Sequence, residues 1–519
     1  MDKLSILWAD DEIEMLKAHI LFLEQKGYDV TTVNNGDDAL IKVEKFNYDI
    51  IFLDEHMPGL SGLETLMRIK NIKTEIPVVM ITKSEEESIM EDAIGSKIAD
   101  YLIKPVNPNQ ILLSLKKILD NRRLISEKTN ANYLQDFRQI GITISDKLSH
   151  TEWSELYKKL VYWELELERS NDPAMYEILT TQKAEANRQF GKFIEKNYSN
   201  WINSEPNDQQ PLLSHQLMAH KIIPIADQSS VPLVVLVIDN LRLDQFKIIQ
   251  PLLQEHFRIE SEETYFSILP TATQYARNAL FCGLLPEDIQ KRLPKMWLND
   301  DDEGSKNQFE SEFFDDLLKR LRKDYKFQYK KVTNYQAGKD LVDSIQNFNQ
   351  YKINLIVYNF VDMLSHARTD MEVIRELAVD EAAYRSLTRS WFDHSPLNEA
   401  LKKLSEKPCR LIITTDHGTI RVKNPSKVIG DRNTNTNLRY KQGKNLAYEK
   451  NEVLAYKNPS EIKLPKTNLS SSYIFAKEDM FFAYPNNYNH YVSFYNDTFQ
   501  HGGVSLEEMI VPFVLLASK

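Results

Sequence analysis

The first residues that could do chemistry are acidic and lie near the amino terminus. Asp10 and Asp11 directly follow one apolar run, and Asp54 ends another. If these runs are parallel strands, their carboxyl ends share one edge of a sheet and the three carboxylates converge. Without a cation between them, the three carboxylates would repel one another. A site made of oxygen ligands and retained water molecules suits Mg²⁺. Thr82 and Lys104 follow two later runs and would bring a hydroxyl and a cation to the same edge.

A second set of residues mixes carboxylates with imidazoles in the second half of the chain. Three apolar runs there end at carboxylates, with histidines nearby or just before the last run. The set comprises Asp239, Asp362, His366, Asp416, His417 and His501. Ligands of both kinds suit Zn²⁺ or Mn²⁺ better than Mg²⁺ or Ca²⁺. Six are enough for two metals about 4 Å apart, which can stabilise the attacking and leaving oxygens of phosphoryl transfer.

A nucleophile for such a site is predicted in residues 269–277. This segment contains Thr271 and Thr273, just after a proline and before a helical pattern. The amino terminus of a helix favours an alkoxide and a phosphate. Arg277, one turn further on, could hold a phosphate oxygen bidentately. The residues by themselves leave both threonines open as the nucleophile.

The elements that must position the acidic set alternate over the first 120 residues. The predicted strands cover residues 4–8, 28–33, 50–53, 78–81 and 101–103, with helical patterns at 13–26 and 37–45. This alternation predicts a flavodoxin-like domain, with a parallel five-stranded sheet and helices on both faces.

The rest of the chain changes its pattern twice. Helical patterns follow one another to residue 225, and strand patterns return at 232–238, 353–360, 410–415 and 509–517. We therefore expect an α/β protein of three domains: the first sheet domain at 1–120, a helical bundle at 121–225 and a second α/β domain at 226–519. The bundle could be a plain spacer, or it could relay a signal or dimerise.

The composition predicts a cytoplasmic protein. The chain has 519 residues and a net charge of −11, which argues against a general nucleic-acid coat protein. Its two cysteines, Cys282 and Cys409, exclude a secreted disulfide scaffold. The amino terminus lacks the pattern of a signal peptide, and no apolar window is long enough to insert into a membrane.

The acidic set resembles the receiver domain of response regulators. The matching residues, in order, are Asp10, Asp11, Asp54, Thr82, Tyr101 and Lys104 with Pro105. The resemblance implies that Asp54 accepts a phosphoryl group from a sensor histidine kinase. It also implies Mg²⁺ on Asp11, Asp54 and the carbonyl of His56, with Asp10 acting through water. Lys104 would pair with the phosphoryl oxygens, and Thr82 and Tyr101 would be the switch pair.

Residues 230–519 resemble the alkaline phosphatase superfamily, and within it the PglZ branch. Thr273 lies ten residues before Gly283, the spacing that relatives show between their nucleophile and the glycine of the following helix. Thr271 remains the alternative. The resemblance implies one zinc ion on the threonine, Asp239, Asp416 and His417. It places the other zinc ion on Asp362, His366 and His501.

The whole chain resembles the PorX-type response regulators of Bacteroidetes. This resemblance implies control of type IX secretion and a zinc-dependent phosphodiesterase that acts on nucleotide substrates. We expect phosphorylation of Asp54 to promote homodimerisation, with the helical segment carrying the change to the hydrolase.

A basic insertion between His417 and His501 could recognise a nucleotide or an oligonucleotide, or it could be a solvated loop. Its basic residues are Arg421, Lys423, Lys427, Arg432, Arg439, Lys441, Lys444 and Lys450. The aromatic-rich stretch 473–495 could stack bases or simply pack in a core.

Two alternatives to a phosphodiesterase stay open. The carboxy-terminal domain could bind a nucleotide or a transcription partner, such as a sigma factor, without turnover. It could also cleave a phosphomonoester, a phosphonate or a sulfate, although threonine in place of cysteine disfavours a sulfatase. Direct binding to duplex DNA is disfavoured, because the sequence has no helix-turn-helix with a basic recognition helix.

Overall fold

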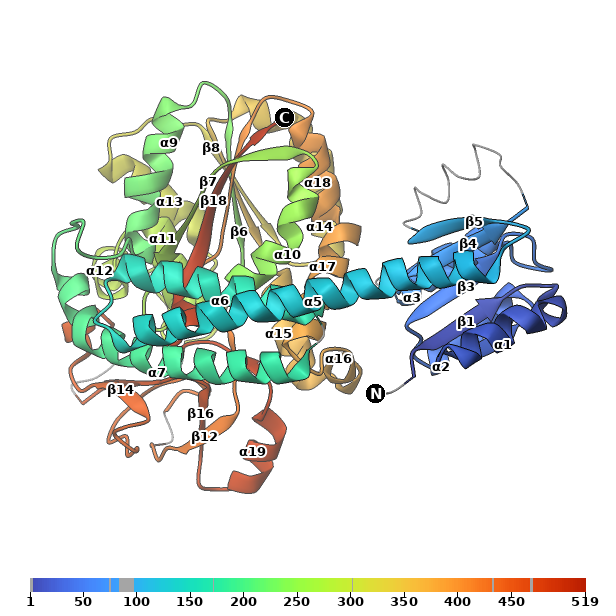
Figure 1. The fold of residues 1–519 in the computed structure, drawn as a ribbon. Coiled ribbons are helices and arrows are strands. Elements are labelled where there is room, and N and C mark those ends of the chain that lie inside the picture. The colour runs from blue at the N-terminus through green and yellow to red at the C-terminus, as the bar shows by residue number, and fades with distance from the viewer. Residues whose placement is uncertain are drawn as a thin grey trace. The chain divides into compact units, whose positions relative to one another are not determined.

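The structure is a computed structural model that describes residues 3–73, 76–83, 98–170, 172–300, 302–431, 434–466 and 470–519, with side chains 120–127 left out. The chain forms two compact units, Met1–Asn132 and Tyr133–Lys519. The boundary expected at residue 120 falls inside one continuous helix, α5 (Pro108–Ser145). Figure 1 shows the elements of both units.

The described part of the first unit contains a five-stranded parallel sheet in the order β2-β1-β3-β4-β5. Its strands are β1 (Ser5–Ala9), β2 (Asp29–Val33), β3 (Ile50–Asp54), β4 (Val78–Thr82) and β5 (Asp100–Ile103). Its helices are η1 (Ile13–Leu16), α1 (Lys17–Gln25), α2 (Gly36–Lys45), α3 (Gly62–Ile72) and the start of α5. The prediction of a flavodoxin-like receiver fold is confirmed, and only the ends of the elements shift by a residue or two.

Side chains of this sheet alternate between two cores, as the pleat of a strand requires. Leu7 and Leu53 lie in the core that also contains residues of α2 and α3. Ile6 and Phe52 lie in the other, with residues of α1 and with Ile111 of α5. Helices therefore cover both faces of the sheet, and its carboxyl edge stays free for chemistry.

The helical segment of the second unit packs directly on the large sheet of that unit. It consists of the end of α5, α6 (His150–Ser170) and α7 (Pro173–Asn203). Trp153 and Leu160 of α6 share one core with Phe190 of α7 and with Leu233 and Val235 of strand β6. The segment is thus part of the body that carries the second set of residues, and Figure 1 shows α6 and α7 lying across it.

The large sheet has six strands among the described residues, in the order β7-β18-β10-β6-β9-β8. They are β6 (Leu233–Ile238), β7 (Phe257–Phe266), β8 (Phe327–Val332), β9 (Ile353–Tyr358), β10 (Arg410–Thr414) and β18 (Ile510–Ser518). Strand β18 runs antiparallel to both of its neighbours. Strands β7 and β8 are absent from the prediction because they form the two edges, where polar side chains such as Glu262 and Lys330 interrupt the apolar pattern.

Helices surround this sheet on both faces. They are α8 (Ser214–Leu217), η2 (Met218–Ile222), α9 (Ile223–Gln228), α10 (Leu243–Gln254), α11 (Thr273–Cys282), α12 (Pro286–Arg292), α13 (Glu310–Arg320), α14 (Tyr335–Ser344), η3 (Ile345–Gln350), α15 (Phe360–Asp370), α16 (Glu372–Leu377), α17 (Glu381–His394) and α18 (Pro396–Ser405). Val234 and Leu236 face the side of α10 and α18, whereas Leu233 and Val235 face the side of α11 and the helical segment.

The insertion after β10 is folded. It contains β11 (Ile420–Arg421), β12 (Asn424–Lys427), β13 (Tyr440–Gly443), β14 (Val453–Tyr456), η4 (Pro459–Ile462), β15 (Ser472–Ala476), β16 (Met480–Ala483), α19 (Tyr488–Tyr495) and β17 (Phe499–Gln500), and α20 (Leu506–Met509) leads into β18. Within the described ranges, no helix combines the length and apolar character that crossing a membrane requires.

Candidate active site

Three of the predicted ligands form a buried cluster, here called the inner triad, at the carboxyl ends of β6 and β10. Asp239 follows β6, and Asp416 and His417 follow the neighbouring parallel strand β10. Nε2 of His417 lies 3.9 Å from Oδ1 of Asp239 and 3.7 Å from Oδ2 of Asp416. All three side chains are at most 1% exposed, so these groups meet at the ends of the two strands, away from water.

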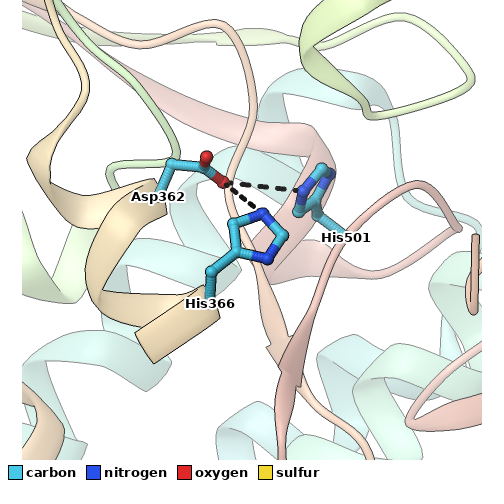
Figure 2. A group of neighbouring side chains, drawn as sticks. All are labelled: Asp362, His366 and His501. Carbon is cyan, nitrogen blue, oxygen red and sulfur yellow. Dashed lines mark ion pairs between the residues drawn. The ribbon is translucent and has the colours of Figure 1, made fainter. Parts of the chain in front are cut away.

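The other three predicted ligands form the outer triad, which Figure 2 shows. Asp362 and His366 lie one turn apart on α15, which begins just after β9, and His501 reaches them from the loop after β17. Oδ1 of Asp362 lies 3.6 Å from Nε2 of His366 and 3.7 Å from Nε2 of His501. The His366 side chain is 67% exposed, so this triad opens to solvent whereas the inner one does not.

Backbone carbonyls orient two of the histidines. Nδ1 of His417 lies 3.1 Å from the carbonyl oxygen of Gly418, and Nδ1 of His501 lies 3.1 Å from that of Thr271. Because a carbonyl oxygen only accepts, each Nδ1 carries the hydrogen and each Nε2 has a lone pair that can accept a hydrogen bond or bind a metal. The two rings stack with their centroids 4.3 Å apart. The inner and outer triads therefore adjoin each other.

The charges of the two triads fit divalent metal ions. Among the described residues, Oδ2 of Asp416 and Oδ1 of Asp362 accept no hydrogen bond although both atoms are buried. Burial and the neighbouring Asp239 carboxylate raise the pKa of Asp416 to about 8 and that of Asp362 to about 6. A cation would remove this repulsion, and carboxylate and imidazole donors together suit Zn²⁺.

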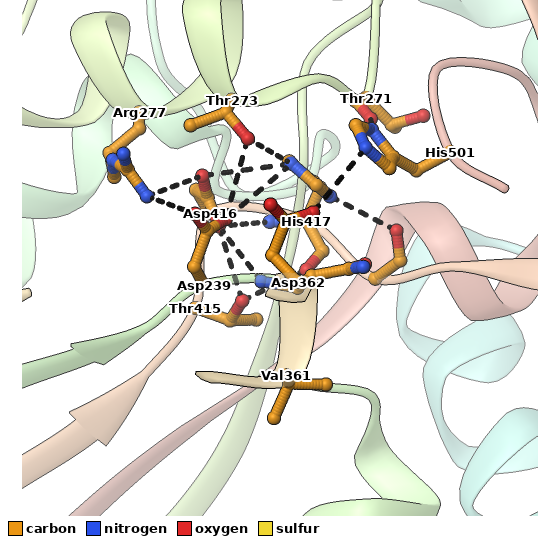
Figure 3. Close-up of polar contacts among 12 residues, drawn as sticks. Asp239, Thr271, Thr273, Arg277, Val361, Asp362, Thr415, Asp416, His417 and His501 are labelled. Atoms are coloured by element: carbon orange, nitrogen blue, oxygen red, sulfur yellow. Dashed lines mark hydrogen bonds and ion pairs between the residues drawn. The ribbon is translucent and has the colours of Figure 1, made fainter. Parts of the chain in front are cut away.

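The two candidate threonines contact different partners, and Figure 3 shows Thr273 beside His417 and Thr271 beside His501. Oγ1 of Thr273, the first residue of α11, lies 3.1 Å from Nε2 of His417 and 3.4 Å from Oδ1 of Asp239. Oγ1 of Thr271 instead donates to the carbonyl of Gly503 at 2.9 Å and accepts from the amide of Gly502 at 3.0 Å. Thr273 therefore points its hydroxyl at the inner triad from a helix amino terminus, whereas the hydroxyl of Thr271 bonds to the backbone of Gly502 and Gly503.

Arg277 forms ion pairs within the protein, whereas the sequence predicted that it would be available to hold a phosphate oxygen. Its Nη1 lies 2.6 Å from Oδ2 of Asp239, and its Nε lies 2.5 Å from Oε1 of Glu310. The side chain is 1% exposed, because two buried carboxylates draw the guanidinium inward. Arg277 thus acts in this structure as a counter-charge to the inner triad.

Several residues that the sequence did not single out support the site. Asn240 has a positive φ of 65°, is fully buried and donates from Nδ2 to Oγ of Ser365 at 3.1 Å. Ser365 lies on α15 between the two outer ligands, so this bond links the turn after Asp239 to the outer triad. The only sequence signal is that Asn240 and Ser365 stand next to ligands. Glu310 had no signal at all, since it lies on a separate helix.

The receiver site also forms. Ligand atoms of Asp10, Asp11 and Asp54 lie within 4.8 Å of one another. Nζ of Lys104 lies 2.9 Å from Oδ2 of Asp10 and 3.0 Å from Oδ1 of Asp54. Burial raises the pKa of Asp54, with the hydrogen bond from Lys104 opposing it. The arrangement is an acidic pocket that already contains its cation and could add Mg²⁺.

The remaining receiver residues surround this pocket in the expected elements. Thr82 ends β4 and is fully buried, Tyr101 lies in β5 and is partly buried, and His56 is exposed just after β3.

The basic insertion differs from the predicted polyanion loop. Arg439 is fully buried and pairs with Glu508 at 2.7 Å, Lys441 is 1% exposed and donates to the carbonyl of Asn435, and Arg421 pairs with Asp497. Arg439 stands just before β13 and Lys441 within it, a strand that pairs with β15, and this pairing explains their burial. Lys423, Lys427 and Lys450 are exposed and Lys444 is partly buried, while Arg432 lies outside the described residues.

The aromatic stretch divides in the same way. Tyr473 and Phe475 belong to the core of the large unit. Helix α19, with Tyr488, Tyr491 and Phe494, buries none of its residues.

Comparisons with known proteins agree with this architecture. The model of the response regulator receiver domain matches residues 6–116, that of the PorX response regulator linker domain matches 123–202, and that of the BREX system PglZ alkaline phosphatase-like domain matches 217–516.

Similar curated proteins are transcriptional regulators. The chain is 34% identical to ResD of Bacillus subtilis over 22% of this chain and 47% of that protein. It is 35% identical to the CpxR homolog of Haemophilus influenzae over 27% of this chain and 60% of that protein. The chain therefore spans about half the length of the curated relatives it matches.

Similar solved structures include a CheY-like receiver domain protein from Methanospirillum hungatei, with 25% identity, 23% of this chain and 95% of that chain covered, and a TM-score of 0.23. A two-component response regulator from Clostridium difficile has 30% identity, with 23% and 97% covered and a TM-score of 0.22. Since the PglZ model matches more than half of the sequence and the other two models precede it in order, the chain belongs to the PglZ alkaline phosphatase-like family, as a PorX-type fusion of receiver, linker and PglZ domain.

Proposed function

We propose that this chain is a two-component response regulator whose output domain is a zinc-dependent phosphodiesterase with Thr273 as its nucleophile. The observation that carries the proposal is the position of the Thr273 hydroxyl, 3.1 Å from His417 at the amino terminus of α11. An alkoxide and a phosphate are both favoured there by the helix dipole.

The six residues of the two triads would hold the metal ions. When bound, two zinc ions neutralise the carboxylates and supply positive charge to the attacking and leaving oxygens. Asp239, Asp416 and His417 would bind one ion in the closed inner site. Asp362, His366 and His501 would bind the other at the open side, where a substrate can enter.

The chain itself contributes the nucleophile and its placement. Oγ1 of Thr273 forms a bond to phosphorus while the P–O bond to the leaving alcohol breaks in line. The hydroxyl proton passes to water, and water protonates the leaving oxygen. A water oxygen then displaces Oγ1 from the phospho-threonine, which returns the free hydroxyl and releases a phosphomonoester.

Nucleotide or oligonucleotide diesters are the substrates that we propose. The exposed lysines of the insertion, Lys423, Lys427 and Lys450, favour a polyanion on a chain whose net charge is −11. The burial of Arg439 and Lys441 leaves this support weaker than the sequence suggested.

For the receiver, we propose that a histidine kinase phosphorylates Asp54 with Mg²⁺ in the acidic pocket. Lys104 is in place to pair with the phosphoryl oxygens, because it lies 3.0 Å from Asp54. Phosphorylation would promote a homodimer through the face that contains Thr82 and Tyr101, and control of type IX secretion would be the output.

The test is turnover of a bis-aryl phosphodiester and of the matching monoester in the presence of zinc. The proteins are the wild type, Thr273→Val, Asp416→Ala and the matched control Thr181→Val, which changes an exposed threonine of α7. We expect diester turnover in the wild type and in Thr181→Val, and a loss of at least about 10³-fold in the other two.

Turnover by Thr273→Val at the rate of the wild type would exclude Thr273 as nucleophile. Bound zinc with no turnover of either ester would instead favour a binding regulator that holds a nucleotide or a transcription partner.

A further inference from the structure

Thr271 makes three hydrogen bonds to one short loop. Its hydroxyl donates to the carbonyl of Gly503 at 2.9 Å and accepts from the amide of Gly502 at 3.0 Å. Its own carbonyl accepts from Nδ1 of His501 at 3.1 Å. A fully buried threonine thus contacts three consecutive residues that lie more than 200 positions away in the sequence.

The loop needs this support because two of its residues are glycines. Gly502 has a φ of 122°, and a Cβ there would meet Cδ1 of Tyr440 at 2.6 Å. At Gly503 a Cβ would meet the carbonyl of Ala476 at 2.5 Å. Positions 502 and 503 can therefore carry no side chain that would hold the loop in place. The amide of Gly503 bonds to Oε1 of Glu508 on one side, and Thr271 supplies the bonds on the other.

The carbonyl of Thr271 also sets the chemistry of His501. It takes the hydrogen of Nδ1, so the lone pair of Nε2 is directed to the outer triad, where Nε2 lies 3.7 Å from Asp362. Partners of this kind fix the tautomer and ring orientation of metal-binding histidines, and their loss commonly weakens metal binding about 10- to 100-fold.

We propose that Thr271 is the positioning residue of the outer metal site and that it holds His501 through both its hydroxyl and its carbonyl. This inference rests on the proposed two-metal function. It gives the two threonines of the segment separate tasks: Thr273 presents its hydroxyl to the inner triad, and Thr271 keeps the outer triad in place two residues earlier. A change at Thr271 alters outer-site metal binding, whereas a change at Thr273 leaves that binding intact.

Zinc competition against a chromogenic chelator on the full-length protein tests this division, because it measures binding without turnover. The His501→Ala variant serves to assign the sites, because the zinc ion that this variant no longer binds is the outer one. We expect two zinc ions on the wild type, and Thr271→Val to bind the outer ion about 10- to 100-fold more weakly. We expect Thr271→Ser, which keeps the hydroxyl, to bind it within about threefold of the wild type.

Thr273→Val is the matched comparison, since it makes the same chemical change two residues away. Its affinity for the outer ion should equal that of the wild type even though its turnover is lost. If Thr271→Val fails to fold, Thr271→Ala replaces it, because alanine removes the hydroxyl without adding bulk.

Wild-type affinity for both ions in Thr271→Val or Thr271→Ala would overturn the inference, and so would an equal loss of the outer ion in Thr271→Ser. A wild type that binds no zinc would overturn the proposed function itself, which keeps the two failures distinct.

Discussion

Nη1 of Arg277 lies 2.6 Å from Oδ2 of Asp239, and both side chains are 1% exposed. A buried guanidinium therefore neutralises a carboxylate that we propose as a metal ligand. Glu310 holds the other edge of the guanidinium at 2.5 Å. The inner triad thus has an internal counter-charge that belongs to the protein.

We predict from this pair that the metal-free protein folds and that Arg277→Met destabilises it. Removing one member of a buried ion pair leaves the other charge uncompensated, which costs about 3 to 5 kcal/mol. Urea unfolding in the presence of a chelator measures this loss, and added zinc should restore part of it. Lys319→Met removes an exposed pair with Asp315 and should change stability by less than about 1 kcal/mol. A metal-free Arg277→Met as stable as the wild type would contradict the prediction.

We predict that Asn240→Gly weakens the outer metal site and leaves the fold intact. Glycine accepts the φ of 65° without strain but removes the bond from Nδ2 to Ser365 on α15. The free energy of unfolding should stay within about 1 kcal/mol of the wild-type value, while outer zinc affinity falls about tenfold. Chelator competition and urea unfolding measure the two quantities. Ser365→Ala should lower outer zinc affinity to the same extent, and the double variant should bind zinc no more weakly than either single variant. If the two losses of affinity add, the two residues act separately.

We predict an acid-dependent contribution from Glu164, which joins α6 to Lys183 of α7 at 2.6 Å and to Arg385 of α17 at 2.9 Å. Burial alone would raise the pKa of Glu164, but the two cations outweigh it and lower that pKa to about 2, from an ordinary value of 4.5. Since the folded pKa is the lower one, the stabilisation is complete above pH 4.5 and is lost as the pH falls toward 2.

Glu164→Gln should therefore cost about 3 kcal/mol at neutral pH, and the difference from the wild type should shrink below pH 4.5. Urea unfolding at a series of pH values measures it. Glu155→Gln, on the same helix but 72% exposed, is the control and should change little. If the difference in free energy of unfolding between the wild type and Glu164→Gln stays constant down to about pH 3, Glu164 is not the titrating group.

We predict that Asp54→Ala abolishes phosphoryl incorporation and with it any response of the esterase to phosphorylation. The carboxylate of Asp54 is the acceptor that we propose, Lys104 lies 3.0 Å from it, and alanine leaves no oxygen there. Labelling with a small-molecule phosphodonor and parallel assays of diester turnover measure both effects. Asp29→Ala, which removes an exposed aspartate of β2, should behave as the wild type. If phosphorylating conditions changed diester turnover as much in Asp54→Ala as in the wild type, the esterase would not respond to phosphorylation of the receiver at Asp54.

The sequence by itself determined the positions of both sets of candidate ligands and most strands that present them. Buried parallel strands are continuous apolar runs, and a carboxylate that follows such a run must lie at the shared carboxyl edge. Asp54, Asp239 and Asp416 are therefore found from local pattern alone. Asp362 and His366 follow in the same way, because a helical turn places residues four apart on one face.

Only the tertiary structure decided which threonine faces the triads and what Arg277 binds. Thr271 and Thr273 have the same chemistry and nearly the same local sequence, and they differ in their contacts with His417 and with the loop at Gly502. The edge strands β7 and β8, the burial of Arg439 and the packing of the helical segment on the large sheet depend in the same way on distant partners. Local sequence patterns predict whether a segment is a helix or a strand and which of its residues are buried. The direction of a polar side chain is instead set by the groups that the fold brings beside it.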